Sequence, residues 1–265
     1  MRRAVLLLAT MALVILLAGG VAQAILNGQP DGNRHPYVGW ASTEEWACSG
    51  TLISPTVFLT AGHCTEVWGS QVVYVTFEPR ADYVPVELDP DGVFDPGDAY
   101  TGRAYTHPSY GFPLYDVGVV VLDEPVSMAT YGRLPQADVV DTFDTGQRLT
   151  VVGYGVRNFE VGGGPPRIGD FATRYRAPVR FLKAEPLLVP GREHTVIDMF
   201  LKYSTGQGGD QGSTCYGDSG GPLFLPDQKT IVGVVSFGRG PYCNSTKFAQ
   251  RIDLPEVLSW VRSFL

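Results

Sequence analysis

The segment CYGDSGGPL, from Cys215 to Leu223, places a single serine, Ser219, between an aspartate and two glycines. Gly, Asp and Ser also form tight turns, so a turn without any chemistry is one interpretation. The other is that Ser219 is a nucleophile. A serine hydroxyl is weakly nucleophilic at neutral pH, so it needs a base, a group that orients this base, and hydrogen-bond donors for the oxyanion.

One of the four histidines has a context that suits a general base. His63 follows the apolar run VFLTA and precedes Cys64, so a disulfide at this point would hold its backbone rigidly within reach of a nucleophile. His35 and His107 each precede a proline, and His194 lies in the polar stretch REHT. We therefore predict that His63 is the base and that His35 and His107 are structural or exposed.

Asp116 is the candidate for the orienting acid. It opens DVGVVVL, one of the most hydrophobic runs of the chain, where a carboxylate is costly to bury unless it has a partner. An aspartate at a strand edge that faces water is the alternative, and it would be preferred for Asp116 considered alone. Because His63 and Ser219 are also present, we predict that Asp116 orients the imidazole.

An esterase or lipase is an alternative to a peptidase, because GDSGG also matches the G-x-S-x-G turn of α/β-hydrolases. That fold requires its histidine after the serine, and no histidine follows Ser219. The order His63, Asp116, Ser219 is instead that of the chymotrypsin arrangement.

Composition limits the kind of scaffold that could position these side chains. The chain has 265 residues, of which 44% are apolar and 18% charged, as in an ordinary globular protein. A formal net charge of −7 leaves no basic face for nucleic acid, so we exclude that partner class. Its 32 glycines and 20 prolines favour short strands joined by turns over long helices.

The pattern of apolar runs predicts an all-β barrel or sandwich. Short runs rich in β-branched residues recur between loop-like segments: GTLISPTVFLTA, SQVVYVTFE, DVGVVVLDE, RLTVVGYG, TIVGVVSFG and KFAQRI. Residues 125–145 separate two groups of such runs, which would allow two packed halves. The final segment LPEVLSWVRSFL has its apolar residues at helical spacing and predicts an amphipathic helix that docks at the end of the chain.

Residues 1–24 have the pattern of a secretory signal peptide. A basic start, MRR, precedes a long apolar stretch, and AQA at residues 22–24 supplies the small residues of a cleavage site before Ile25. An uncleaved membrane anchor is the alternative, since residues 4–26 are long enough to span a bilayer. We expect cleavage, a secreted extracellular protein of residues 25–265, and no attachment to the membrane afterwards.

Four cysteines in an exported chain suggest two disulfides, for which three pairings exist. Their spacing favours Cys48 with Cys64 and Cys215 with Cys243. Metal binding is the alternative, but no two cysteines have the spacing of a C-x-x-C ligand pair, so we expect no metal.

Two further motifs could carry a function. The acidic run DPDGVFDPGD does not match the EF-hand pattern, so we expect a solvated loop rather than a calcium site from its four aspartates, Asp89, Asp91, Asp95 and Asp98. Asn244 begins an N-glycosylation sequon, which matters only in a secretory pathway that glycosylates.

Taken together, TAGHC, DVGVVVL and GDSGGPL resemble the three signature segments of the chymotrypsin/trypsin family of serine peptidases. The similarity runs from Ile25 to the terminal helix. It implies two six-stranded antiparallel β-barrels, an active site in the cleft between them and a closing C-terminal helix. It also implies a monomer that acts on protein or peptide substrates without a cofactor.

The resemblance assigns a role to each matching position. His63 would be the general base and then the acid, Asp116 the orienter of the imidazole, and Ser219 the acylated nucleophile. The backbone N–H groups of Gly217 and Ser219 would form the oxyanion hole, for which the absent side chain of Gly217 permits the loop conformation. The two expected disulfides match those beside the catalytic histidine and beside the specificity pocket of the family.

The resemblance extends to the N-terminus. Members of this family usually become active when cleavage frees an Ile-Val-Gly-Gly-like end, whose ammonium pairs with the aspartate before the serine, here Asp218. ILNGQP at Ile25 is similar to that end, although Leu26 and Asn27 replace its usual valine and glycine. Our hypothesis is that removal of the signal peptide itself creates the active enzyme.

Ser213, six residues before Ser219, stands where trypsin-like enzymes have an aspartate at the floor of the primary pocket. An uncharged floor offers no partner to a substrate lysine or arginine, so we expect an apolar or aromatic residue before the cut. The walls would include Thr214 and the segment Ser236, Phe237 and Gly238.

Two departures from the family pattern bear on this pocket. Phe237 replaces the usual tryptophan, and CNSTKFAQ is shorter than the usual loop. Lys247 in that loop could reach toward the pocket and favour acidic substrate residues, which is the alternative to an apolar preference.

A catalytically inactive homologue that acts as a binding protein is the alternative function. Such homologues typically lose a triad residue, whereas this chain retains His63, Asp116 and Ser219 together with Gly217. We therefore predict a secreted serine endopeptidase that hydrolyses peptide bonds through an acyl-enzyme intermediate.

Overall fold

The computed structural model describes residues 25, 28–81, 95–156, 159–160, 167–168, 172–188, 196–204, 212–239, 243 and 245–265. The predicted signal peptide, His194, the sequon at Asn244, and Asp89 and Asp91 of the acidic run lie outside these residues. None of the helices in the described part of the chain is both long and apolar enough to cross a membrane.

Six antiparallel strands in the first half of the chain close into a barrel in the order β2-β3-β4-β7-β6-β5. They are β2 (Val38–Ser42), β3 (Ala47–Leu52), β4 (Val57–Thr60), β5 (Val72–Thr76), β6 (Tyr100–Thr106) and β7 (Gly118–Leu122). β4 and β7 are buried along almost their whole length, because both faces of these strands are covered. This explains why VFLT and GVVVL are continuous apolar runs rather than alternating ones.

A second sheet has the strand order β1-β11-β12-β15-β14-β13-β8, and pairing of β11 with β8 closes its last six strands into another barrel. The strands are β1 (Gln29–Pro30), β8 (Arg148–Gly153), β11 (Tyr175–Leu188), β12 (Val196–Tyr203), β13 (Pro222–Phe224), β14 (Ile231–Gly238) and β15 (Lys247–Arg251). A separate two-stranded ribbon is formed by β9 (Phe159–Glu160) and β10 (Arg167–Ile168).

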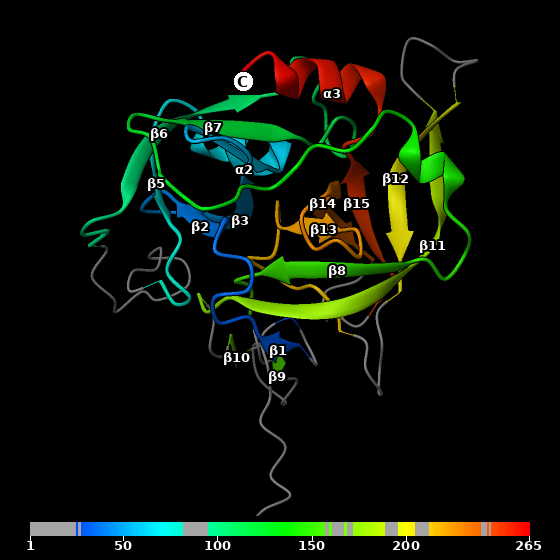
Figure 1. Cartoon of the computed structure of the whole chain (residues 1–265), viewed down its shortest axis with the longest axis horizontal. Coiled ribbons are helices and arrows are strands. Elements are labelled where there is room, and N and C mark those ends of the chain that lie inside the picture. The colour runs from blue at the N-terminus through cyan, green and yellow to red at the C-terminus, as the bar shows by residue number, and fades with distance from the viewer. Residues whose placement is uncertain are drawn as a thin grey trace, which may run out of the picture.

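The helical part of the described structure is small: α2 (Gly62–Trp68), the 3₁₀ helix η1 (Val139–Thr142) and α3 (Pro255–Arg262). The predicted fold of two six-stranded barrels and a C-terminal helix is therefore confirmed. Figure 1 shows most of the first barrel on the left, β12 to β15 of the second barrel on the right, and α3 at the top.

Helix α3 docks through its apolar face, as its residue spacing predicts. Val257 and Val261 are fully buried in the same apolar cluster as the first barrel. The ring centroids of Trp260 and His107 are 5.0 Å apart, and those of Phe264 and Tyr105 on β6 are 5.4 Å apart. The helix begins with Pro255, whose fixed φ suits a first helical turn.

His35 is a structural histidine. Its Nδ1 lies 2.6 Å from Asp31 Oδ1, its Nε2 lies 3.2 Å from Gln228 Oε1, and its side chain is buried. Asp31 also accepts a hydrogen bond from Arg174 Nε at 3.1 Å. This buried cluster ties the segment that follows β1 to the second barrel, and both ring nitrogens of His35 have hydrogen-bond partners in it.

Candidate active site

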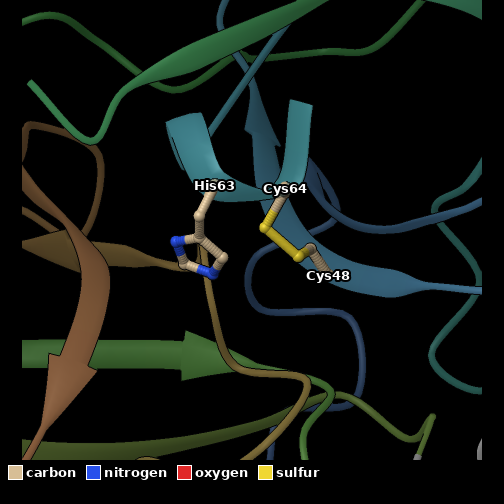
Figure 2. Close-up of side chains that lie close together, drawn as sticks. All are labelled: Cys48, His63 and Cys64. Carbon is tan, nitrogen blue, oxygen red and sulfur yellow. A yellow bond between two sulfur atoms is a disulfide. The ribbon is translucent and has the colours of Figure 1, made fainter. Parts of the chain in front are cut away.

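His63 is positioned by the first turn of α2, which follows directly on the buried strand β4. The neighbouring Cys64 is joined by a disulfide to Cys48 on β3, so the turn is tied covalently to the barrel. Figure 2 shows the imidazole beside this disulfide. The side chain of His63 is 18% exposed, which leaves it accessible from the cleft described below.

Asp116 lies in the loop just before β7 and is completely buried. One of its carboxylate oxygens, Oδ2, lies 2.9 Å from His63 Nδ1, and the other accepts a hydrogen bond from the backbone N–H of His63 at 2.7 Å. The carboxylate thus contacts both the ring and the main chain of the histidine, which fixes the orientation of the imidazole and places the proton on Nδ1.

Two residues of the second barrel support Asp116. The hydroxyl of Ser236 on β14 donates a hydrogen bond to Asp116 Oδ2. The side-chain oxygen of Gln250 on β15 accepts a hydrogen bond from the backbone N–H of Asp116 at 3.0 Å. The sequence suggested Ser236 only as a pocket wall and did not suggest Gln250, because neither contact leaves a signal in residue spacing.

Ser219 lies in the loop between Cys215 and β13, and it lines the same cavity as His63. Among the contacts between described residues, none is a hydrogen bond between these two side chains. Such bonds are often long in free enzymes and tighten when substrate binds. The carbonyl of Ser219 accepts a hydrogen bond from the N–H of Ser49 on β3 at 2.8 Å, so this loop is anchored to the other barrel.

The two predicted oxyanion donors are both available. Gly217 has a φ of +88°, a conformation that favours glycine. Within the part of the chain that the structure describes, neither the N–H of Gly217 nor that of Ser219 has an acceptor. Free N–H groups on one loop can donate together to a single developing oxyanion.

The geometry of this loop also depends on Gly220, which has a φ of +77°. A Cβ at this position would lie 2.1 Å from Thr60 Oγ1 and 2.4 Å from the carbonyl oxygen of Ser49. We expect Gly220→Ala to lower the free energy of unfolding by about 3 kcal/mol or to prevent folding, because overpacking adds to the backbone strain.

The matched control is Gly146→Ala. Gly146 also has a positive φ, +94°, but a Cβ there would have no atom within 4 Å, so we expect a loss of only about 1 kcal/mol. Urea unfolding of both variants measures the difference, and equal losses would show that the contact with Thr60 and Ser49 is unimportant.

A cleft of about 400 Å³ joins these groups, and its lining comes from both barrels. The first-barrel side contributes aromatic and apolar side chains near His63, and the second-barrel side contributes the loop of Ser219 and the end of β14. Several rim residues were not expected from the sequence: Trp46, Glu66, Val67, Tyr110, Phe112 and Tyr216. Phe112 and Tyr216 are more than half exposed, as expected for side chains that meet a bound chain.

The predicted pocket residues fall into two groups. Thr214, Ser236, Phe237 and Gly238 line the cleft. Ser213 is buried and is not among the described lining residues. Its hydroxyl donates to the carbonyl oxygen of Cys243 and lies 3.4 Å from the carbonyl oxygen of Thr214.

The proposed activation pair is not joined in the full-length chain. Ile25 is fully buried within the apolar cluster of the second barrel. Asp218 is also fully buried, and its carboxylate accepts hydrogen bonds from the N–H groups of Gly155 at 2.9 Å and Cys215 at 2.8 Å. Burial raises the pKa of Asp218 to about 7, although these two hydrogen bonds and the charge of Lys247 act in the opposite direction.

The structure contains both expected disulfides, Cys48–Cys64 and Cys215–Cys243. Cys48, His63 and Cys64 bring three potential ligand atoms within 4.8 Å of one another. The two sulfurs are bonded to each other, so they are not thiolates and cannot bind a metal as such.

The chain is similar in sequence to known proteases. The chain is 28% identical over 265 residues to a chymotrypsin of Phaedon cochleariae, which covers 91% of this chain and 79% of that protein. It is 27% identical to human kallikrein-4, over 89% of each chain. It is also 28% identical to the serine proteinase stubble of Drosophila melanogaster over 78% of this chain, but it spans only 25% of the length of that relative.

The fold is similar to that of solved structures at lower identity. HL collagenase superimposes with a TM-score of 0.62 at 22% identity, over 88% of this chain and 94% of that one. Human heparin binding protein superimposes with a TM-score of 0.60 at 19% identity, over 89% and 94%. The family model described as Trypsin matches residues 25–261, so this chain belongs to the trypsin family of serine proteases.

Proposed function

We propose that this chain is a secreted, monomeric serine endopeptidase whose mature part is residues 25–265, with its active site between two barrel halves that divide near residues 125–145. The observation that carries this proposal is the contact between Asp116 and His63, which lines the same cleft as Ser219. In the loop of Ser219, two backbone N–H groups have no acceptor among the described residues. This arrangement supplies each group that a serine nucleophile needs.

The reaction follows from the positions of these groups. His63 Nε2 takes the proton of Ser219 as its Oγ attacks the peptide carbonyl, and the N–H groups of Gly217 and Ser219 stabilise the oxyanion. The protonated imidazole is stabilised by the buried carboxylate of Asp116 and gives its proton to the leaving amine. Water then hydrolyses the acyl-enzyme in the same way, with His63 again as the base.

Activation at the N-terminus is part of this proposal. We infer that cleavage before Ile25 frees an ammonium that pairs with Asp218. This would compensate a buried carboxylate that has no ion-pair partner among the described residues of the uncleaved chain.

The test is covalent labelling with a serine-directed fluorophosphonate. We expect the secreted protein to be labelled and Ser219→Ala to lose the label completely, because only an activated serine reacts at a useful rate. Ser259→Ala, which removes an exposed hydroxyl on α3, is the matched control and should be labelled like the parent chain. A folded parent chain that takes up no label would instead favour an inactive, substrate-binding homologue.

The identity of the residue before the cut is a separate question. The uncharged Ser213 led to the expectation of an apolar or aromatic residue there, and this stays a prediction. The position of Lys247 in the cleft favours the acidic alternative.

A further inference from the structure

Among the described residues that line the cleft is a buried lysine, Lys247, that takes no part in the mechanism above. Lys247 is the first residue of β15 and pairs with Gly238 of β14 on one side and with Tyr203 of β12 on the other. It lines the same cavity as His63 and Ser219. Of the described residues that form this lining, it is the only lysine or arginine.

The side chain of Lys247 extends along the pocket wall and not out to solvent. A Cβ added to Gly238 would lie 2.6 Å from both Cδ and Nζ of Lys247, so the ammonium end lies directly against this glycine. Only 6% of the surface of Lys247 is exposed. Gly238 thus provides the space that the lysine tail occupies, and the ammonium lies on the wall next to the segment Ser236–Phe237.

In the part of the chain that the structure describes, this ammonium has no partner. Among the described residues, no carboxylate lies within ion-pair distance of Lys247 and no acceptor forms a hydrogen bond with it. Burial lowers the pKa of Lys247, and the charge of Asp218 acts in the opposite direction. The carboxylate of Asp218 itself accepts hydrogen bonds from the backbone N–H groups of Gly155 and Cys215.

The remaining polar groups of this wall are already engaged. The Thr214 hydroxyl is 2.8 Å from that of Tyr203, and the Ser236 hydroxyl donates to Asp116. Ser213 is bonded to the carbonyl of Cys243. Of the described Lys, Ser and Thr side chains on this wall, the ammonium of Lys247 is therefore the one left without a partner for an entering substrate side chain.

We propose that Lys247 is the specificity-determining residue of the primary pocket and that it selects an acidic side chain, aspartate or glutamate, immediately before the cut. The proposal rests on the proposed endopeptidase function. A carboxylate would complete an ion pair that is shielded from water, whereas an apolar side chain would cover the ammonium and leave it without any partner. A substrate lysine or arginine would be repelled.

The experiment compares peptides Ala-Ala-Pro-X with a fluorogenic amide after X, where X is Glu, Gln, Asp, Phe, Leu or Lys. Gln is the matched probe, because it has the shape of Glu without the charge. We expect kcat/KM for Glu to exceed that for Gln and Phe by about 100-fold or more, since sites built for a polar partner reject analogues that lack it.

Three variants locate the effect. Lys247→Met should lose the preference for Glu over Gln and should cleave after Phe or Leu at least as well as the parent. Lys247→Arg should retain an acidic preference, because it restores the cation. Lys202→Met is the control: it removes the same charge from neighbouring β12, where the ammonium lies 3.9 Å from Glu185 and outside the described lining of the cleft, and should leave the preference unchanged.

Labelling by the fluorophosphonate separates the two proposals. A labelled parent chain that cleaves after Phe or Leu in preference to Glu overturns the role of Lys247 and leaves the peptidase intact. If the chain takes up no label, the peptidase proposal fails. Calorimetry then tests the role of Lys247 separately, by measuring how tightly N-acetyl-Ala-Ala-Pro-X-amide binds to the Ser219→Ala chain. Tighter binding of Glu than Gln, lost in the added Lys247→Met variant, supports the proposal, and equal binding overturns it.

Discussion

Replacing Asp116 by asparagine is expected to lower kcat by about 10⁴-fold while the chain stays folded. The side chain is isosteric, so the loss comes from hydrogen-bond direction and charge. Asp116 now accepts three hydrogen bonds: from the backbone N–H of His63, from His63 Nδ1 and from the Ser236 hydroxyl. An asparagine can accept only through its single oxygen.

The contact with the backbone N–H of His63 at 2.7 Å decides how an asparagine would be oriented. That donor cannot turn away, so the amide oxygen would remain opposite it. The amide NH₂ would then replace Oδ2 and donate to His63 Nδ1, which forces the ring proton onto Nε2. His63 would present a proton to Ser219 in place of a lone pair and could no longer act as its base.

The measurement is kcat and kcat/KM on the best peptide substrate, with thermal unfolding to verify the fold. Asp123→Asn is the matched control, because Asp123 is exposed and, among the described residues, its carboxylate accepts a single hydrogen bond, from the Thr101 hydroxyl. It should leave kcat within about twofold of the parent. A loss of less than tenfold in Asp116→Asn would mean that the contact between His63 and Asp116 does not fix the tautomer.

The sequence predicted the strands that have a local signature. The continuous apolar runs around Phe58 and Val120 become the paired strands β4 and β7, and the spacing of Val257 and Val261 predicted the helix that docks on the first barrel. It did not predict how the strands close. The pairing of β8 with β11, for example Gly153 opposite Tyr175, depends on the packing of the entire second barrel and has no local periodicity.

The candidate site divides in the same way. His63, Asp116 and Ser219 could be selected because each lies in a segment whose composition is chemically unusual. Gln250 could not, because its contact with Asp116 joins residues 134 positions apart. The exposure of Phe112 could not be predicted either, because an aromatic residue is expected to be buried. Its place at the rim of the cleft depends on the tertiary structure.

The second large effect is the pH dependence of stability that Asp218 causes. It depends on whether Ile25 carries a free amine. In a chain extended before Ile25, burial raises the pKa of Asp218 from its ordinary value of 3.8 to about 7. The folded state then binds more protons than the unfolded state between these pH values, so stability falls as the pH rises through this window. From pH 5 to pH 8 the expected loss is about 2–3 kcal/mol.

A chain that begins at Ile25 should behave in the opposite way. Its ammonium would pair with Asp218 and lower the pKa of the carboxylate, so this group would contribute stability throughout the window from pH 5 to pH 8 and lose it only at lower pH. Asp218 is adjacent to both Gly217 and Ser219, so this pairing would hold the loop in the conformation described above, and we expect only this form to cleave peptides. N-terminal sequencing of the secreted, active protein should therefore find Ile25 first.

Urea unfolding of both forms at pH 5 and pH 8, in a Ser219→Ala background that prevents self-digestion, measures the difference in slope. Both forms share every side chain from Ile25 onward, so the comparison between forms removes the contribution of the side chains they have in common. Asp218→Asn should remove the loss of stability between pH 5 and pH 8 from the extended chain, and it should abolish activity in the chain that begins at Ile25, because the ammonium would lose its buried counter-charge. Equal slopes in the parent forms, or full activity in the extended chain, would exclude Asp218 as the partner of the new N-terminus.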